Sequence, residues 1–266
     1  MPKNRFALRL LFLLAVLGVA VFSFASPRAQ ASEERARTMV DQLYTPQGSL
    51  PITDLVVELE DHAATSSADP VLWGRTKMFF KSPAKLRVDV VQVTPKSPND
   101  GRLTVIIRDG ENMYIYGAAQ YPAKKQADSP VATLALPFNI QHYRRDAERE
   151  FYDLGTERIE NTTVHRIQIL SPSQPNWTAI VWVDAERRVP LQLETGVPDK
   201  DGKIKKKRVL YRDIRKLSDG RYFPFQLQIF EDDVLREVKI YKGVKVNVGL
   251  DPTLFDPVRE FLNGPR

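Results

Sequence analysis

Apolar residues recur at every second position over most of the chain after residue 50. Leu55, Val57 and Leu59 show this period, and so do the stretches at 77–81 and 86–90. A period of two is typical of β-strands that bury one face and expose the other. This pattern constrains the fold more than any other feature, and it predicts a mainly β chain.

Asp-Gly pairs separate the strand-like stretches. Four such pairs occur, at residues 100–101, 109–110, 201–202 and 219–220. The dipeptide favours the tight turns that connect antiparallel strands. The expected hairpins join 103–107 to 113–116, 189–194 to 204–211, 209–214 to 222–230, and 225–230 to 234–248. Because most predicted strands are neighbours in sequence, we expect an antiparallel meander rather than a parallel sheet with crossover helices.

Two helical regions accompany the predicted strands. Apolar residues at helical spacing predict a helix over residues 32–43, with Ser32 as its N-cap. Residues 130–150 lack the period of two and end in a charged stretch, which indicates one or two short helices inserted between strands. The expected architecture is one strongly curved antiparallel sheet in a single α+β domain over residues 32–266.

Residues 1–31 are typical of a cleavable signal peptide. Three basic residues before position 10 precede an uncharged run of 16 residues from Leu10 to Ala25. Ala29-Gln30-Ala31 then fits the small-x-small cleavage pattern, so we expect cleavage after this tripeptide and export to the periplasm. The alternative is an uncleaved anchor, but the run is shorter than the ~20 apolar residues that a transmembrane helix needs.

The signal segment carries most of the excess positive charge of the chain. It holds four basic residues and no acid, so the formal net charge of +6 falls to +2 over residues 32–266. Nucleic-acid binding requires a concentrated positive surface, so no nucleic-acid partner is expected. The chain has no cysteine, which excludes disulfides, thiolate metal sites and a lipid anchor on an N-terminal cysteine.

No motif of a catalytic or cofactor-binding site is present. The sequence lacks the G-x-G-x-x-G, Walker, H-E-x-x-H and G-x-S-x-G patterns. Its three histidines are scattered along the chain. We therefore expect no catalytic residue, no cofactor and no metal site.

The basic run from Lys203 to Arg208 allows two interpretations. One is a docking surface for an acidic partner or for anionic lipid headgroups. The other is an edge strand that its lysines protect from aggregation. The sequence alone favours the edge strand.

Five sequence blocks together resemble a known family. The blocks are Phe80-Lys81-Ser82-Pro83 with Lys85-Leu86-Arg87-Val88, Asp109-Gly110 with Met113-Tyr114-Ile115-Tyr116, Val181-Trp182-Val183-Asp184 with Pro190-Leu191, Phe223-Pro224, and Val244–Asp251 with Leu254-Phe255-Asp256-Pro257. Their order and spacing over residues 32–257 resemble the outer-membrane lipoprotein-sorting protein superfamily, which has the LolA-like carrier fold. The resemblance implies a half-open antiparallel barrel with an apolar concave face and a helical lid over its mouth.

The resemblance also implies a function. The chain would be a periplasmic carrier or binding protein, without enzymatic activity, that shelters the acyl chains of a lipid or lipoprotein in an apolar cavity. Its partners would be that cargo and membrane-bound donor or acceptor proteins, and the chain itself would be a monomer. The alternative is an envelope sensor of lipid or lipoprotein that regulates a signalling partner by protein–protein binding.

One position departs from the narrow carrier branch of the family. There, as the resemblance implies, an arginine just before the proline of the Lys-x-Pro motif helps to hold the lid shut. Here that position is Ser82. The lid latch is therefore in doubt, and so is lipoprotein as the cargo, unless Arg75 or Arg87 takes the role.

Alternation within the predicted strands identifies the residues expected to face the cargo. The expected wall residues are Leu55, Val57, Met78, Phe80, Val88, Val90, Ile106, Tyr114, Tyr116, Trp182, Leu191, Leu193, Phe225, Leu227, Ile229, Val238 and Ile240. The expected lid residues, within about 130–150, are Leu134, Leu136, Phe138 and Ile140. Any sheet needs an apolar core, so each of these residues also has a purely structural interpretation.

Overall fold

The fold is mainly β, as the alternation predicts. A computed structural model describes residues 27–44, 51–64, 69–82, 85–93, 103–109, 112–117, 149–172, 178–198 and 203–258. These residues form one helix, twelve strands and a short 3-10 helix. No helix among them is long and apolar enough to cross a membrane.

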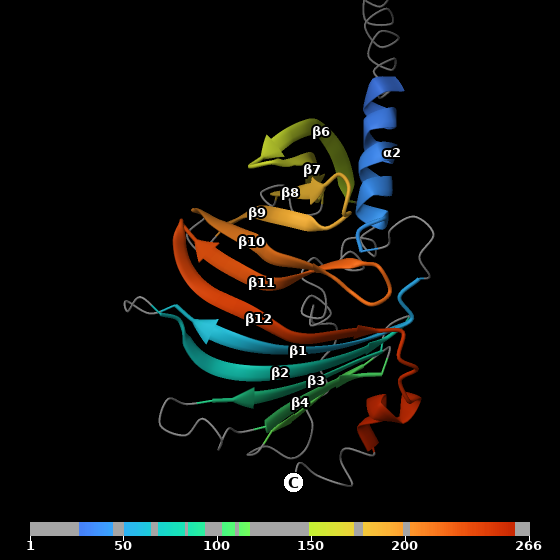
Figure 1. Ribbon diagram of the computed structural model, residues 1–266, viewed down its shortest axis with the longest axis vertical. Coiled ribbons are helices and arrows are strands. Elements are labelled where there is room, and N and C mark those ends of the chain that lie inside the picture. Colours follow the sequence, from blue (N-terminus) through green and yellow to red (C-terminus); the bar gives the residue numbers. More distant parts are fainter. Residues whose placement is uncertain are drawn as a thin grey trace, which may run out of the picture.

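The strands form a single antiparallel sheet (Figure 1). They are β1 (Asp54–Ala63), β2 (Val71–Lys81), β3 (Lys85–Gln92), β4 (Leu103–Arg108), β5 (Met113–Gly117), β6 (Glu150–Ile159), β7 (Thr162–Leu170), β8 (Thr178–Asp184), β9 (Pro190–Pro198), β10 (Ile204–Lys216), β11 (Tyr222–Glu231) and β12 (Val234–Val246). Their order is β5-β4-β3-β2-β1-β12-β11-β10-β9-β8-β7-β6. Nearly every strand therefore pairs with its neighbour in sequence, which confirms the predicted meander.

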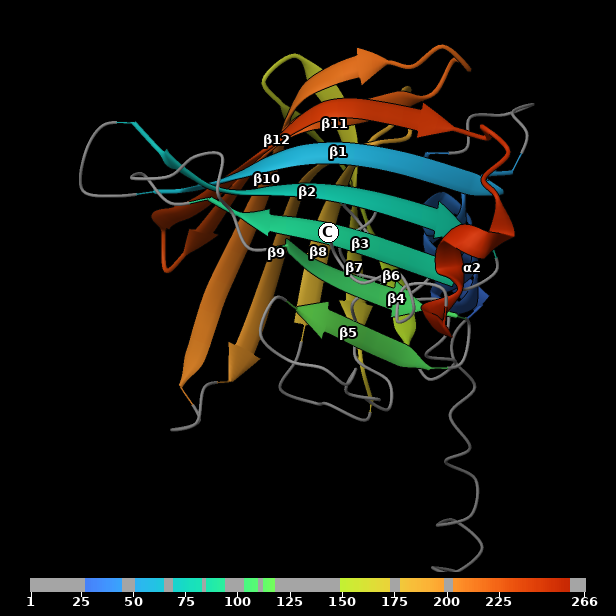
Figure 2. The same ribbon diagram turned by 90° about the horizontal axis from the view of Figure 1, so that it is seen from below.

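The sheet curves strongly without closing. Figure 2 shows β1 to β5 running across the view while β6 to β9 run steeply behind them. The edge strands β5 and β6 are not paired with each other. The result is a half-open antiparallel barrel, which confirms the predicted fold class for the described residues.

The helix α2 (Pro27–Asp41) begins earlier than the sequence predicts. Ser32 therefore lies inside the helix and is not its N-cap. Its hydroxyl instead accepts a hydrogen bond from the backbone N–H of Asp153 in β6, at 3.1 Å. The predicted apolar face of the helix is correct, because Ala36 and Val40 are fully buried. The helix ends at Asp41, and Leu43, which was expected to be its last residue, is buried in the turn that follows.

Cross-strand pairing divides the sheet into two faces. Residues directly opposite each other in adjacent strands point to the same side of the sheet. We call the side that carries Leu55 and Val57 the inner face, because α2 packs on it, and the other side the outer face. The basic strand β10 lies between β9 and β11, so the prediction of an edge strand is wrong for most of its length, although residues 204–206 pair only with β9.

A second, smaller apolar cluster lies on the outer face at the β4–β5 edge. It consists of Val105, Ile107 and Tyr116, with Tyr114 packed against it. The Tyr116 hydroxyl donates to the carbonyl oxygen of Pro257 at 2.7 Å, just after the 3-10 helix η2 (Pro252–Phe255). The C-terminal segment therefore covers this edge of the sheet.

Candidate functional site: the inner face of the half-barrel

The inner face is apolar across the first half of the sheet. Val57 in β1 lies opposite Met78, which lies opposite Val88, which in turn lies opposite Ile106 in β4. The first three side chains are fully buried, while Ile106 is half-buried. The same face of β1 to β4 therefore presents a row of aliphatic side chains perpendicular to the strands.

A matching row crosses the second half of the sheet. Val209 in β10 lies opposite Leu193, Leu193 lies opposite Val181, and Val181 lies opposite Ile167 in β7. On its other side, Val209 lies opposite Ile229 in β11. This row ends at β12, where Ile229 lies opposite Glu237. The two halves of the inner face meet instead at Tyr241, which lies opposite Leu59 and contacts Phe223.

Helix α2 joins the two halves into one core. The side chains of Ala36, Val40, Leu43 and Tyr44 belong to the same buried cluster as the inner-face residues of both halves. Arg37 lies over the ring of Phe151 in β6, with its guanidinium carbon 4.8 Å from the ring centroid. The helix therefore occupies part of the inner face, beside the β6 edge.

Most of the residues expected to line the wall lie on the inner face. They are Leu55, Val57, Met78, Phe80, Val88, Val90, Ile106, Leu191, Leu193, Phe225, Leu227 and Ile229. Phe80, Val90, Ile106 and Leu193 are only partly buried, so these four retain the most accessible apolar surface.

Five of the expected wall residues lie on the outer face, and the register corrects their placement. They are Tyr114, Tyr116, Trp182, Val238 and Ile240. Trp182 lies opposite Arg166, whose guanidinium carbon is 5.8 Å from the ring, and its indole N–H donates to Glu157. The tryptophan therefore packs among charged side chains, although it borders the core.

The strand β12 shows why alternation misplaced Val238 and Ile240. Between them lies Lys239, whose ammonium is on the inner face, 2.6 Å from Asp61 Oδ1 and 2.6 Å from Glu237 Oε1. Thr76 donates to the other oxygen of Asp61 at 3.0 Å. A lysine in an alternating strand is normally assigned to the solvent side, so periodicity does not predict this ion pair between the half-buried Lys239 and the buried Asp61.

Burial and the neighbouring carboxylates together shift the pKa values of two residues in this polar cluster. Desolvation alone would lower the pKa of Lys239, but Asp61 and Glu237 outweigh it and raise the pKa. Beside them, burial raises the pKa of Tyr241, and the charges of Asp61 and Glu237 raise it further. Lys239 therefore stays charged and Tyr241 neutral through the physiological range. Among the described residues, no group of acids and histidines is arranged to hold a metal ion.

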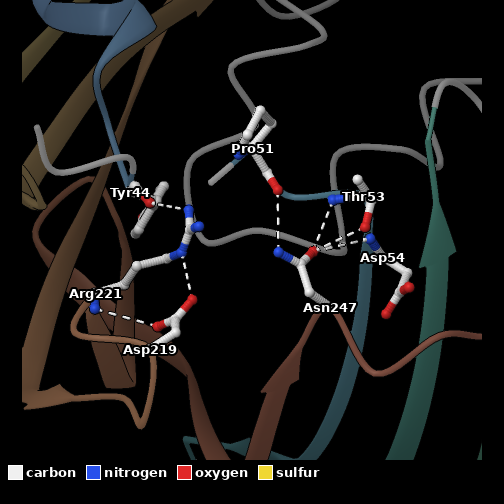
Figure 3. A network of polar contacts seen from close by, with 7 residues as sticks. All are labelled: Tyr44, Pro51, Thr53, Asp54, Asp219, Arg221 and Asn247. Carbon is white, nitrogen blue, oxygen red and sulfur yellow. Dashed lines mark hydrogen bonds and ion pairs between the residues drawn. The ribbon is translucent and has the colours of Figure 1, made fainter. Parts of the chain in front are cut away.

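A buried arginine fixes the C-terminal end of α2 (Figure 3). Arg221, 2% exposed, donates from Nη1 to the carbonyl oxygen of Tyr44 at 3.0 Å and from Nε to Asp219 at 2.6 Å. A positive charge at this place also complements the negative end of the helix dipole. The sequence did not identify Arg221, because Tyr44 lies 177 residues away.

Asn247 ties the start of β1 to the end of β12 beside this arginine (Figure 3). Its side-chain oxygen accepts from the N–H of Thr53 at 2.8 Å, and its amide donates to the carbonyl oxygen of Pro51 at 3.1 Å. The carboxylate of Asp54 accepts from the N–H groups of Val248 and Gly249. Hydrogen bonds from these two side chains to backbone groups therefore hold the start of β1 against the end of β12.

The structure describes the positions expected to form the latch but not the expected lid residues. Leu134, Leu136, Phe138 and Ile140 lie outside the described residues. Ser82 is exposed at the end of β2, where its N–H donates to the carbonyl oxygen of Thr53. Arg75 and Arg87 pair with Glu60 and Asp89 on the outer face, so neither replaces the missing arginine on the inner face.

Comparisons with solved structures identify proteins that share this fold. No family model matches the chain, and no curated protein matches its sequence. Solved structures do match. A DUF1329 family protein from Desulfovibrio piger is 12% identical, with a TM-score of 0.61 over 85% of this chain and 97% of that protein.

Two further structures give the same result. A protein described as an outer membrane lipoprotein-sorting domain, from Vibrio parahaemolyticus, is 12% identical with a TM-score of 0.60, over 85% of this chain and 98% of that one. A LolA superfamily protein from Nitrosomonas europaea is 14% identical with a TM-score of 0.56, over 85% and 96%. At such low identities, these likenesses establish a LolA-like fold.

Proposed function

We propose that the chain is a periplasmic carrier or binding protein for a lipid or an acylated lipoprotein. The observation that carries this proposal is the continuous apolar inner face, which crosses both halves of an open sheet and is shared with one helix. The signal-peptide pattern of residues 1–31 supports export. The lipoprotein-sorting description of a protein with the same fold supports the choice of cargo.

The physics of acyl chains explains why such a surface suits a carrier. Each methylene costs about 0.8 kcal/mol to expose to water, so a multiply acylated molecule does not cross an aqueous compartment unaided. A closed barrel would trap its cargo, whereas an open sheet leaves an edge through which chains enter and leave. In our proposal the partly buried Phe80, Val90, Ile106 and Leu193 contact the acyl chains, and the eight buried inner-face residues form the wall beneath them. Leu134, Leu136, Phe138 and Ile140 would cover the cargo.

The proposal is tested with a fluorescent acyl-chain probe and two matched variants. Ile106 and Ile240 are both half-buried isoleucines, but they lie on the inner and outer face respectively. We expect Ile106→Gln to weaken probe binding several-fold, because an amide in an apolar site costs about 1–3 kcal/mol. Ile240→Gln should leave binding unchanged. Equal binding by both variants, or no probe binding by the parent chain, would contradict the proposal.

A further inference from the structure

Exposed apolar side chains gather at one end of the sheet. Of the seven large apolar side chains exposed among the described residues, four lie where β1, β9 and β11 end and β2, β10 and β12 begin. They are Val71, Trp73, Ile204 and Val234, between 37% and 51% exposed. We call this the hairpin end, and Figure 1 shows it on the side away from α2.

The basic run belongs to the same end. Lys203, Lys205, Lys206 and Lys207 are all exposed, and Ile204 lies among them. Lys207 lies opposite Glu231 in β11, and Glu231 lies opposite Val234 in β12, so one strand separates the lysines from the second exposed aliphatic residue. Because successive residues of β10 are exposed here, both of its faces are in contact with solvent.

Nearby acids neutralise only part of this charge. Arg208 pairs with Asp233 at 3.2 Å, and Lys206 approaches Glu194 at 3.8 Å. Among the described residues, no ion pair involves Lys205 or Lys207. From Lys207 onward β10 is an interior strand, which needs no lysines to protect an edge, whereas residues 204–206 pair only with β9.

We propose that the hairpin end docks on the surface of an anionic bilayer. Ile204 and Val234 would enter the interface, while the lysines contact lipid headgroups, each contributing about 1 kcal/mol near an anionic surface. Exposed aliphatic side chains interspersed with lysines favour a lipid surface over an acidic protein, because both kinds of contact are then satisfied together. This docking needs no bound cargo, so it stands apart from the proposed carrier function.

Vesicle flotation tests the docking. The chain, expressed from its full-length gene and with its N-terminus established by intact mass, is mixed with vesicles of phosphatidylcholine alone or with added phosphatidylglycerol. We expect binding only to the anionic vesicles, and salt should weaken it. The double variant Lys205→Gln/Lys207→Gln should bind about 30-fold more weakly, because two lysine contributions are lost.

Matched variants at the opposite end serve as controls. Lys216 and Lys245 are exposed lysines there, and Val248 and Val258 are exposed valines. Lys216→Gln/Lys245→Gln and Val248→Ser/Val258→Ser should keep full binding, whereas Ile204→Ser/Val234→Ser should lose it several-fold. Circular dichroism verifies that all variants are folded.

Three results would overturn the docking proposal. The first is equal binding to neutral and anionic vesicles, and the second is an equal loss in the control variants. The third is an absence of vesicle binding together with tight binding to soluble polyglutamate, which would instead identify an acidic protein as the partner of the basic run.

Discussion

Val57 and Glu58 are neighbours in β1, yet their surroundings differ completely. Val57 is fully buried between Met78 and Val244 on the inner face. Glu58 is exposed on the outer face, 2.7 Å from the ammonium of Lys77, and this partner lowers its pKa. The comparison shows that the inner face of this strand is held by burial of apolar area, while its outer face carries a solvent-exposed ion pair.

The difference between the faces has an energetic consequence. Burial of an aliphatic side chain contributes about 1.5–3 kcal/mol, whereas a surface ion pair contributes about 0–1 kcal/mol. Substitutions of buried inner-face residues should therefore affect folding, and those of the exposed ion pairs on the outer face should be tolerated. The predictions below test this asymmetry in order of decreasing effect.

The largest effect is expected for a charge placed on the inner face. Val57→Asp would bury an unpaired carboxylate and should lower the free energy of unfolding by more than about 3 kcal/mol. Val56→Asp, one residue away on the half-buried outer face, should cost less than about 1 kcal/mol. Urea denaturation measures both. Similar losses for the two variants would contradict the assignment of the faces.

The second effect concerns the attachment of α2 to the inner face. Arg221→Ala removes the donors to Tyr44 and Asp219 and leaves a cavity, which should cost about 2–3 kcal/mol. Hydrogen exchange should show the loss first in α2, since its C-terminal end is then untethered. An exchange pattern in α2 identical to that of the parent chain would rule out this anchoring role.

The third effect appears as a dependence on pH. Burial raises the pKa of Tyr241 above its ordinary value of 10.0, so the folded state holds this proton more tightly than the unfolded state. The resulting stability is complete below pH 10 and is lost as the pH rises further. Tyr241→Phe keeps the ring beside Phe223 and should flatten the alkaline slope by up to about 1.36 kcal/mol per pH unit. Unchanged slopes in alkaline urea melts would place Tyr241 in contact with solvent.

The smallest effect is expected for the outer-face ion pair. Glu58→Gln removes the attraction to Lys77 and should change the free energy of unfolding by less than about 1 kcal/mol. Added salt should reduce that change further, because both side chains are half-exposed. A loss as large as that of Arg221→Ala would mean that outer-face charges help to hold the barrel together.

The sequence predicts the strands and their order well, because alternation and turn residues are local signals. The tight β11–β12 turn at Asp232-Asp233 shows this, since both residues adopt the positive φ that such a turn requires. The predicted apolar face of α2 is equally accurate. The sequence does not predict the start of the helix at Pro27, because Ser32 is a good N-cap in isolation but hydrogen-bonds to β6 instead.

The sequence does not predict which face of several strands points inward. In β8 both Val181 and Trp182 are apolar, so periodicity does not decide which of them points inward. In β12 the inward residue is Lys239, and its partner Asp61 lies 178 residues away. Sequence reasoning treats alternation as a property of one strand, whereas burial depends on partners from others.

Native mass spectrometry of the chain purified from a periplasmic extract, followed by lipid extraction, tests the central claim most directly. We expect a co-purifying acylated species in defined stoichiometry, which is reduced in Ile106→Gln but not in Ile240→Gln. A single mass without ligand, unchanged after incubation with total membrane lipid, would contradict the claim that the inner face binds acyl chains.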